Sequence, residues 1–373
     1  MTQPHATKVL VIGYVWPEPR SSAAGGHMMQ ILETFLQQGW DVTFSSPAGT
    51  GEHRADLTVL GIREVPIELN NSSFDTFIGE LAPDIVLFDR FMMEEQFGWR
   101  VEKHCPDALR VLETSDLQSL RDARHQRLKE RLKTSDDAND FNELFAPASY
   151  VPPVSFEDCA HFLSIGNFRH APNWDAVLWM KSTIWPLIRE QLPKAQLHIY
   201  GAYTPPKATA LHNPGQGFHV MNWAEDALKV MSDARVCLAP LRFGAGIKGK
   251  IVDAMLCGTP TITTPIGAEA MHGEHLWPGA VTRTAQAFAD CAVQLYKEEA
   301  LWTDAQSKGK ALLADRYRQS EHGPALIEKL LYCQQHLAQL RSDNFTGSML
   351  RHHHHKSTQY MAQWIEAKNR KPL

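Results

Sequence analysis

The stretch from Val236 to Met271 reads VCLAPLRFGAGIKGKIVDAMLCGTPTITTPIGAEAM. Its short apolar runs are typical of buried parallel strands, and the segment between them, Ile247–Leu256, is typical of an apolar helix. A glycine-rich loop leads into this helix, and glycine there lets the backbone approach a ligand closely. The order strand, loop, helix, strand and second loop predicts part of an α/β sheet with a ligand site at the start of the helix.

Lysines mark the start of that helix. Lys248 and Lys250 oppose the positive end of the helix dipole, so a bound anion is expected to compensate them. The unpaired N–H groups of a helix N-terminus suit a diphosphate. Asp253 follows on the same helix and can accept a hydrogen bond from a sugar hydroxyl. A glycine-rich loop alone fits equally a tight strand-to-helix turn whose lysines lie in solvent.

Outward from this stretch, the same pattern occurs twice along the chain. Lys8–Tyr14 and Asp41–Ser45 flank a helix whose apolar residues recur from Met28 to Leu36 at helical spacing, which predicts a βαβ unit. Ile85–Phe88 and Leu109–Leu112 extend that sheet. Strands at His161–Ile165, Gln196–Tyr200, Phe218–Met221, Val236–Leu238 and Thr261–Thr264 predict a second sheet. From about 285 to 340 the chain is expected to be helical, followed by a polar break at 342–348 and a last helix near 357–368.

Composition excludes several classes of protein. The chain has 373 residues, enough for two domains, and 43% of them are hydrophobic. A net charge of -5 argues against a general nucleic-acid binder. The six cysteines form no CxxC pair, so a reduced cytoplasmic setting fits best and no zinc framework is expected. No apolar run approaches the ~18–20 residues of a spanning helix, so any membrane contact is expected to be peripheral, at the inner membrane face.

The order of motifs resembles the donor-binding region of the glycosyltransferase group 1 family, the retaining GT-B enzymes classed as GT4. Besides the opening stretch, Ser164–Gly201 carries the family's glycine loop, its PN-x-D-A helix start and its P-x-A-x-L-x-I-x-G strand. The resemblance is good over 160–320 and looser over the first 120 residues. It implies an α/β fold with two Rossmann-like, doubly wound domains facing across a cleft: 1–155 for the acceptor, 156–345 for the donor, and 346–373 as a helix returning to the first domain.

The resemblance also implies roles for individual residues. Lys248 corresponds to the family's diphosphate-binding lysine, Arg169 to its arginine partner, and Asp253 to the acid that contacts the donor ribose. The first acid of the family's acidic pair, which contacts the donor sugar, falls at Ala245, and an alanine side chain cannot make that contact. The other implied donor-binding residues are Gly25, Gly26, Gly166, Asn167, Gly244, Gly246, Ile247, Gly267, Ala268 and Glu269. His27, Arg90 and Asp116 are candidates for the acceptor side, although each also fits an ordinary loop or helix role. No metal or other cofactor is expected, because the positive charges of Lys248 and Arg169 would stabilise the leaving diphosphate.

Three segments depart from the family pattern or remain open to two readings. Lys133–Cys159 lacks the strand that the family places before the second domain, so the first domain is expected to be shortened by about one βα unit. The charged segment Leu117–Asp140 is expected to be a solvated helix, and Ala146–Val154 a linker. His352–His355 fits either an ordinary native segment or a metal-binding tract. Trp364 and Ile365, in the last helix, are expected to pack on the first domain.

The function predicted from the sequence is transfer of a sugar from a nucleotide-diphosphate sugar to a glycan or other glycoconjugate acceptor, with polysaccharide biosynthesis as the family's usual territory. One alternative is a sugar-nucleotide epimerase. The other is a degenerate GT-B chain that binds nucleotide or a partner without catalysis, a reading that the shortened first domain favours. Sugar, base, acceptor and oligomeric state are not encoded in any motif discussed above.

Overall fold

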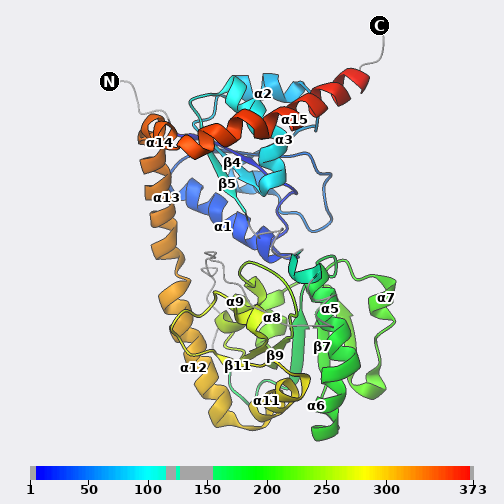
Figure 1. Cartoon of the computed structure of the whole chain (residues 1–373). Coiled ribbons are helices and arrows are strands. Elements are labelled where there is room, and N and C mark those ends of the chain that lie inside the picture. The colour runs from blue at the N-terminus through cyan, green and yellow to red at the C-terminus, as the bar shows by residue number, and fades with distance from the viewer. Residues whose placement is uncertain (1–5, 115–122, 127–153, 370–373) are drawn as a thin grey trace. The chain divides into compact units, whose positions relative to one another are not determined.

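The computed structural model describes residues 6–114, 123–126 and 154–369, with side chains throughout these ranges except 348–356. Its contacts divide the described chain into two compact units. The first unit comprises described residues within 1–18, 28–115 and 320–373, and the second those within 19–27 and 116–319. Each unit contains one parallel sheet (Figure 1).

The sheet of the first unit has five parallel strands in the order β3-β2-β1-β4-β5. These strands are β1 (Lys8–Ile12), β2 (Asp41–Ser46), β3 (Arg63–Pro66), β4 (Ile85–Asp89) and β5 (Leu109–Glu113). Val9 of β1 pairs with Val42 on one side and Ile85 on the other. The chain winds outward from β1 in both directions, which is the doubly wound order of a Rossmann-like sheet.

Helices cover both faces of this sheet because its central strands are apolar on both sides. Val9 and Val11 of β1 pack with one core cluster, and Leu10 and Ile12 with another. The first cluster takes side chains from α1 (Ala23–Gln37) and α13 (Gln319–Gln335), and the second from α2 (Ser73–Leu81) and α3 (Phe91–His104). A short 3-10 helix, η1 (Leu57–Leu60), precedes β3.

Two further helices complete the first unit: α14 (Leu337–Asp343) and α15 (Phe345–Asn369). The polar break expected at 342–348 is therefore wrong, since α15 begins twelve residues before the predicted Ser357 and Asn344 alone separates the two helices. The prediction for Trp364 is also wrong. The helix α15 packs on α3 through Ala362, but the side chain of Trp364 is 62% exposed. The backbone of His352–His355 lies within α15, and their side chains lie outside the described residues.

The sheet of the second unit has six parallel strands in the order β11-β10-β9-β6-β7-β8. They are β6 (His161–Ile165), β7 (Leu197–Tyr200), β8 (Phe218–Asn222), β9 (Ala234–Ala239), β10 (Thr261–Thr263) and β11 (Gly279–Val281). Counted from β6, this is again the Rossmann order, and the winding reverses between β6 and β9. In such sheets ligands bind outside the carboxyl ends of the strands at the point of reversal.

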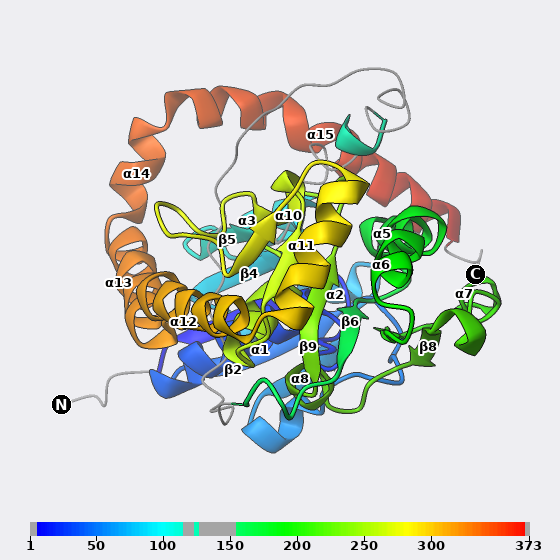
Figure 2. The same cartoon turned by 90° about the horizontal axis from the view of Figure 1, so that it is seen from below.

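The helices of the second unit also lie on both faces of its sheet. One core cluster joins β6 and β7 to α11 and to a long helical segment with a π-helical turn, and the other joins β6 and β9 to α8 and α9. The helix α11 packs against β9 and β10, and Figure 2 shows it beside β9. The segments are α5 (Ala171–Trp179), η2 (Met180–Ile184), α6 (Trp185–Gln191), α7 (Pro206–Thr209), η3 (Pro214–Gln216), α8 (Ala227–Ser232), α9 (Gly249–Leu256), α10 (Pro265–Ala268), α11 (Ala285–Lys297) and α12 (Glu299–Arg316).

The predicted fold class, α/β with two Rossmann-like sheets, is confirmed by both topologies. The segment 127–153, which holds most of the expected missing strand and linker, lies outside the described residues. None of the described helices is long and apolar enough to cross a bilayer.

Candidate functional site

The candidate donor site lies where the winding of the second sheet reverses. β6 ends at Ile165 and leads into Gly166, while the neighbouring strand β9 ends at Ala239 and leads through a glycine-rich loop to α9. Two loops that are more than 70 residues apart in sequence therefore start side by side at the carboxyl edge of the sheet. This places the stretch that suggested a ligand site at the position that Rossmann-like sheets use for ligands.

The glycine-rich loop adopts a backbone that favours glycine. Gly244 has φ 150° and Gly246 φ 70°, and both values disfavour a residue with a side chain. Lys248 is the N-cap of α9 and is 8% exposed. Its side chain has no acceptor atom, so it cannot satisfy the first N–H groups of the helix as a serine or aspartate N-cap would. The helix start therefore retains the donors that an anion requires.

Lys250 reaches from α9 to the first turn of α5, which follows β6 and its glycine loop. Its Nζ donates to Asn173 Oδ1 over 2.6 Å. A side chain on Gly166 would place its Cβ 2.9 Å from the same Nζ and 2.6 Å from Asn173 Nδ2, so Gly166 is required for this close approach. A small cavity at this point is lined by residues that include Gly166, Asn173 and Lys250, with Ser164 and Tyr200 from the strands. The ammonium group of Lys250 thus joins the first turn of α9 to the first turn of α5, beside Gly166.

Sequence reasoning assigned the diphosphate to Lys248 and treated Lys250 as additional charge. The structure brings Lys250, rather than Lys248, into contact with Asn173 beside Gly166. The sequence KGK at the start of the helix indicated that a lysine there could bind an anion. It could not indicate which of the two lysines contacts Asn173, which lies 77 positions away.

Burial gives this site charges that respond to pH near neutrality. It lowers the pKa of Lys250 to about 8 and raises the pKa of Asp253 to about 7. Both groups act electrostatically on Cys237 of β9, whose thiol pKa is raised to about 11, chiefly by burial. Near pH 7 the lysine is mostly charged and the aspartate is about half ionised. A bound anion can therefore change the protonation of both groups.

Arg169 and Asn167 belong to the turn after β6. The backbone N–H of Arg169 donates to Asn167 Oδ1 over 2.8 Å, and Asn167 Nδ2 donates to Ser21 O over 3.5 Å. The guanidinium carbon of Arg169 lies 3.5 Å from the ring centre of Tyr203, in a cation–π contact. Arg169 is exposed, so its charge can reach a ligand in this turn.

The second glycine-containing loop is fixed by a residue that sequence reasoning did not single out. Glu269 receives two hydrogen bonds from Arg124, 2.6 and 2.7 Å long, and Arg124 also donates to Gly244 O over 2.8 Å. The side chain of Arg124 is 11% exposed, so the expectation of a solvated face is wrong at this residue of the charged segment. Next to it, the ring of His125 stacks on Phe243 with centroids 4.4 Å apart.

The remaining predicted donor residues occupy several positions. Gly267 and Ala268 form the short helix α10 rather than an open loop, and Gly267 packs so closely on Thr263 that a side chain would collide with it. The side chain of Ile247 packs on a core cluster that includes Ile251. The backbone N–H groups of Gly267 and Ala268 already donate to Thr264, to its Oγ over 3.2 Å and to its carbonyl oxygen over 3.0 Å.

The predicted glycine loop Ser21–His27 is largely helical, because α1 begins at Ala23. Gly25 and Gly26 therefore lie in the first turn, where Ser22 Oγ accepts from the Gly25 N–H over 3.0 Å. His27 follows on the same helix. Residues 19–27 belong to the second unit, in which Trp223 Nε1 donates to Arg20 O over 3.1 Å. The Gly26 N–H donates to Ser22 O over 3.1 Å, so the N–H groups of both glycines have partners within the start of the helix.

The acceptor candidate Arg90 lies at the carboxyl edge of the first sheet. It has φ 71° and ψ 153°, a conformation that is essentially restricted to glycine, and its N–H donates to Glu113 O over 2.7 Å. Its guanidinium carbon lies 4.9 Å from the Tyr14 ring centre, and its Nε lies 3.5 Å from buried Asp89. Strain of this kind is often concentrated at functional sites. Asp116, the third acceptor candidate, lies outside the described residues.

Within the described part of the chain, no group of three or more histidine, cysteine, aspartate or glutamate side chains is arranged to hold a metal ion. The described cysteines are free. The expectation of a metal-independent reaction stays a prediction.

Comparisons with known proteins point in one direction. Residues 160–298 match the family described as glycosyl transferases group 1. No curated protein matches the chain in sequence. A glycosyltransferase from Rickettsia africae ESF-5 is similar with a TM-score of 0.61 and 10% identity, over 87% of this chain and 98% of that one.

Two further structures are similar at low identity. WaaG, a glycosyltransferase involved in lipopolysaccharide biosynthesis, has a TM-score of 0.55 and 12% identity, over 84% of this chain and 98% of its own. An alpha-glucosyltransferase in complex with UDP and a DNA 13-mer has a TM-score of 0.60 and 12% identity, over 87% of this chain and all of that one. At such identity these likenesses show the fold, which is of the GT-B type.

Proposed function

We propose that the protein transfers a sugar from a nucleotide-diphosphate sugar to a glycan or other glycoconjugate, with retention at the anomeric carbon, because residues 160–298 match the glycosyl transferases group 1. The observation that carries the proposal is the meeting of Lys250, Gly166 and the start of α9 where the winding of the second sheet reverses. One structural neighbour was solved with UDP, which supports a nucleotide donor.

In the proposed reaction the bond between the anomeric carbon and the diphosphate oxygen breaks, and its electron pair stays with the diphosphate. Lys250, Lys248 and the N–H groups at the start of α9 stabilise the charge that develops there. Arg169 contributes from the turn after β6. Asp253 accepts from a ribose hydroxyl, for which its half-ionised state near pH 7 is sufficient. No step requires a metal, because these cations supply the positive charge.

On the acceptor side we place Arg90, Asp116 and His27. The oxygen of the acceptor hydroxyl forms the new bond to the anomeric carbon, and its proton passes to the oxygen of the departing diphosphate. The strained backbone of Arg90 supports this assignment because such strain is often concentrated at functional sites.

The test is release of nucleoside diphosphate from a panel of UDP-, GDP- and ADP-sugars, with and without glycan acceptors. We expect release from at least one donor, and a loss of at least ~100-fold in the Lys248→Ala variant, the size of effect seen when one charge-stabilising donor is removed. Lys310→Ala, which removes a charge from the exposed side of α12, is the matched control and should act as wild type.

Other outcomes would support the alternatives. Tight nucleotide binding without release from any donor would indicate a binding protein that has lost catalysis. Conversion of the donor to an epimer in the absence of an acceptor would indicate an epimerase. Near-normal rates in Lys248→Ala would contradict the role given to that residue.

A further inference from the structure

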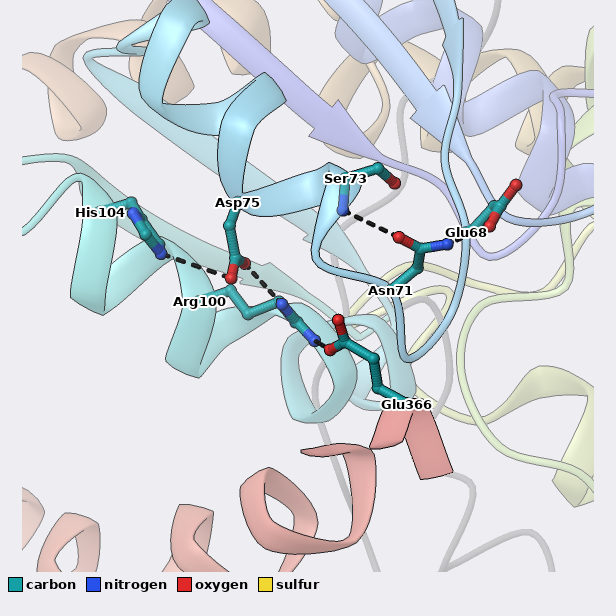
Figure 3. Close-up of polar contacts among 7 residues, drawn as sticks. All are labelled: Glu68, Asn71, Ser73, Asp75, Arg100, His104 and Glu366. Atoms are coloured by element: carbon teal, nitrogen blue, oxygen red, sulfur yellow. Dashed lines mark hydrogen bonds and ion pairs between the residues drawn. The ribbon is translucent and has the colours of Figure 1, made fainter. Parts of the chain in front are cut away.

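One face of α15 is attached to the first unit by a buried ionic contact. Arg100 of α3, whose side chain is 3% exposed, lies between Asp75 of α2 at 2.6 Å and Glu366 of α15 at 3.4 Å (Figure 3). His104 Nε2 lies 3.6 Å from the same Asp75. A buried charge that lost its partners would be strongly destabilising, so this contact fixes which side of α15 faces the unit.

Two further residues of α15 lie on the attached face. Thr358 donates to Glu95 of α3 over 3.2 Å, and Ala362 is 3% exposed. Positions 358, 362 and 366 are spaced four apart, which places them along one side of a helix. The opposite side of the last three turns is therefore directed away from the first unit.

That outer side carries large apolar side chains. Tyr360, Met361 and Trp364 are 62%, 65% and 62% exposed. Lys368 lies beyond them, with its ammonium 5.1 Å from the centre of the Trp364 ring. We call these four residues the outer face of α15. From Ser357 to Asn369 the exposed residues include this lysine and no acid, because Glu366 is directed at Arg100.

Charge distinguishes this end of the chain from the rest. The protein as a whole has a net charge of -5, but residues 351–373 contain five lysines and arginines and a single acid, Glu366. A cationic segment with exposed tryptophan and tyrosine is the composition that favours the interface of an anionic bilayer, where the rings lie at the level of the headgroups. Apolar burial and attraction to anionic lipid then act together.

We propose that the outer face of α15 docks on an anionic lipid surface. The helix lies on the surface, with Trp364, Tyr360 and Met361 inserted among the headgroups and Lys368 beside lipid phosphates. This inference does not depend on the proposed glycosyl transfer, since it rests on residues of the first unit alone.

A second copy of the chain is a less suitable occupant. A stable dimer buries about 800 Å² on each partner, more than three side chains on one narrow helix face provide. A two-fold contact through this face would also bring like-charged segments of the two copies together. An anionic lipid surface avoids both difficulties, because it accommodates a small apolar face and attracts the positive charges.

The test is co-sedimentation of the full chain with vesicles of phosphatidylcholine containing 30% phosphatidylglycerol, and with phosphatidylcholine alone. We expect binding to the anionic vesicles, little binding to the neutral ones, and weaker binding at 1 M NaCl. The double variant Tyr360→Ser, Trp364→Ser should lose at least about fivefold in partition coefficient. Lys368→Gln should lose about fivefold, the effect of about 1 kcal/mol for one cation near an anionic surface.

Leu276→Ser is the matched control, because it removes a side chain that is 70% exposed in the second unit and should leave partition unchanged. Circular dichroism and thermal melting establish that each variant is folded. Equal binding of wild type and the double variant, or equal binding to neutral and anionic vesicles, would overturn the proposal. A concentration-dependent dimer that Trp364→Ser abolishes in analytical ultracentrifugation would replace it with self-association.

Discussion

Because burial lowers the pKa of Lys250 to about 8, nucleotide binding should weaken as the pH rises through that value. The perturbation is a change from pH 7 to pH 9. The charged fraction of Lys250 then falls from about 0.9 to about 0.1. If the ammonium form alone binds the diphosphate well, the apparent affinity for a nucleoside diphosphate falls about tenfold over this range.

Asp253 and the nucleotide itself also change charge in this range, so the wild type by itself does not isolate the lysine. Lys250→Met provides the comparison, because it keeps most of the apolar stem and removes the titrating amine. Asp253 and the nucleotide titrate in both proteins, and their effects cancel in the ratio of the two affinities. That ratio is expected to favour wild type at pH 7 and to shrink about tenfold at pH 9.

The assay is isothermal titration calorimetry with UDP and GDP at both pH values, after thermal melts establish that both proteins are folded at pH 9. Lys310→Met, which loses a charge on the exposed side of α12, should bind as wild type at each pH. An affinity ratio between wild type and Lys250→Met that is the same at pH 7 and pH 9 would refute the reasoning.

Three further predictions concern the same unit. Gly166→Ala should weaken nucleotide binding at least tenfold in the same titration, because its Cβ would lie 2.6 Å from Asn173 Nδ2 and displace that side chain from Lys250; unchanged affinity would contradict the close approach. Asp253→Asn should raise the midpoint of thermal unfolding at pH 8 but not at pH 3.5. Burial raises the pKa of this carboxyl from 3.8 to about 7, so its ionisation destabilises the fold by up to about 4 kcal/mol. This destabilisation is absent below pH 3.8 and complete above pH 7. Equal changes in the unfolding midpoint at pH 3.5 and pH 8 would contradict the raised pKa. His198, stacked on His161 at 4.0 Å, has a pKa lowered to about 4, chiefly by burial and then by the charges of His161 and His219. Stability is therefore lost as the pH falls from 6.5 to 4. The variant His198→Phe should remove this loss, so that its thermal midpoint changes less than that of the wild type between pH 7 and pH 5.

Sequence patterns predicted both sheets because buried parallel strands are continuous apolar runs. They missed β3 and β11, whose sequences REVP and GAV are short and lie at sheet edges, where burial imposes little pattern. The end of the chain was misjudged for a related reason. Residues 342–348 are polar, and polarity was taken as a break, although the segment 345–348 continues as helix in α15.

The candidate site was predictable in its place but not in its contacts. A glycine-rich loop before a helix indicates a ligand site from local sequence alone. That Lys250 meets Asn173, or that Arg124 holds Glu269 from 145 residues away, depends on the packed fold. The exposure of Trp364 could not be predicted either, since helical spacing identifies an apolar face without indicating whether anything covers it.

The most direct test of the central claim is a crystal structure of the chain with a bound nucleoside diphosphate. The account predicts the diphosphate within hydrogen-bond distance of Lys250 Nζ and of backbone N–H groups between Gly246 and the first turn of α9, with the ribose beside Asp253. A nucleotide bound elsewhere on the second unit, or one whose phosphates contact neither Lys250 nor the start of α9, would contradict it.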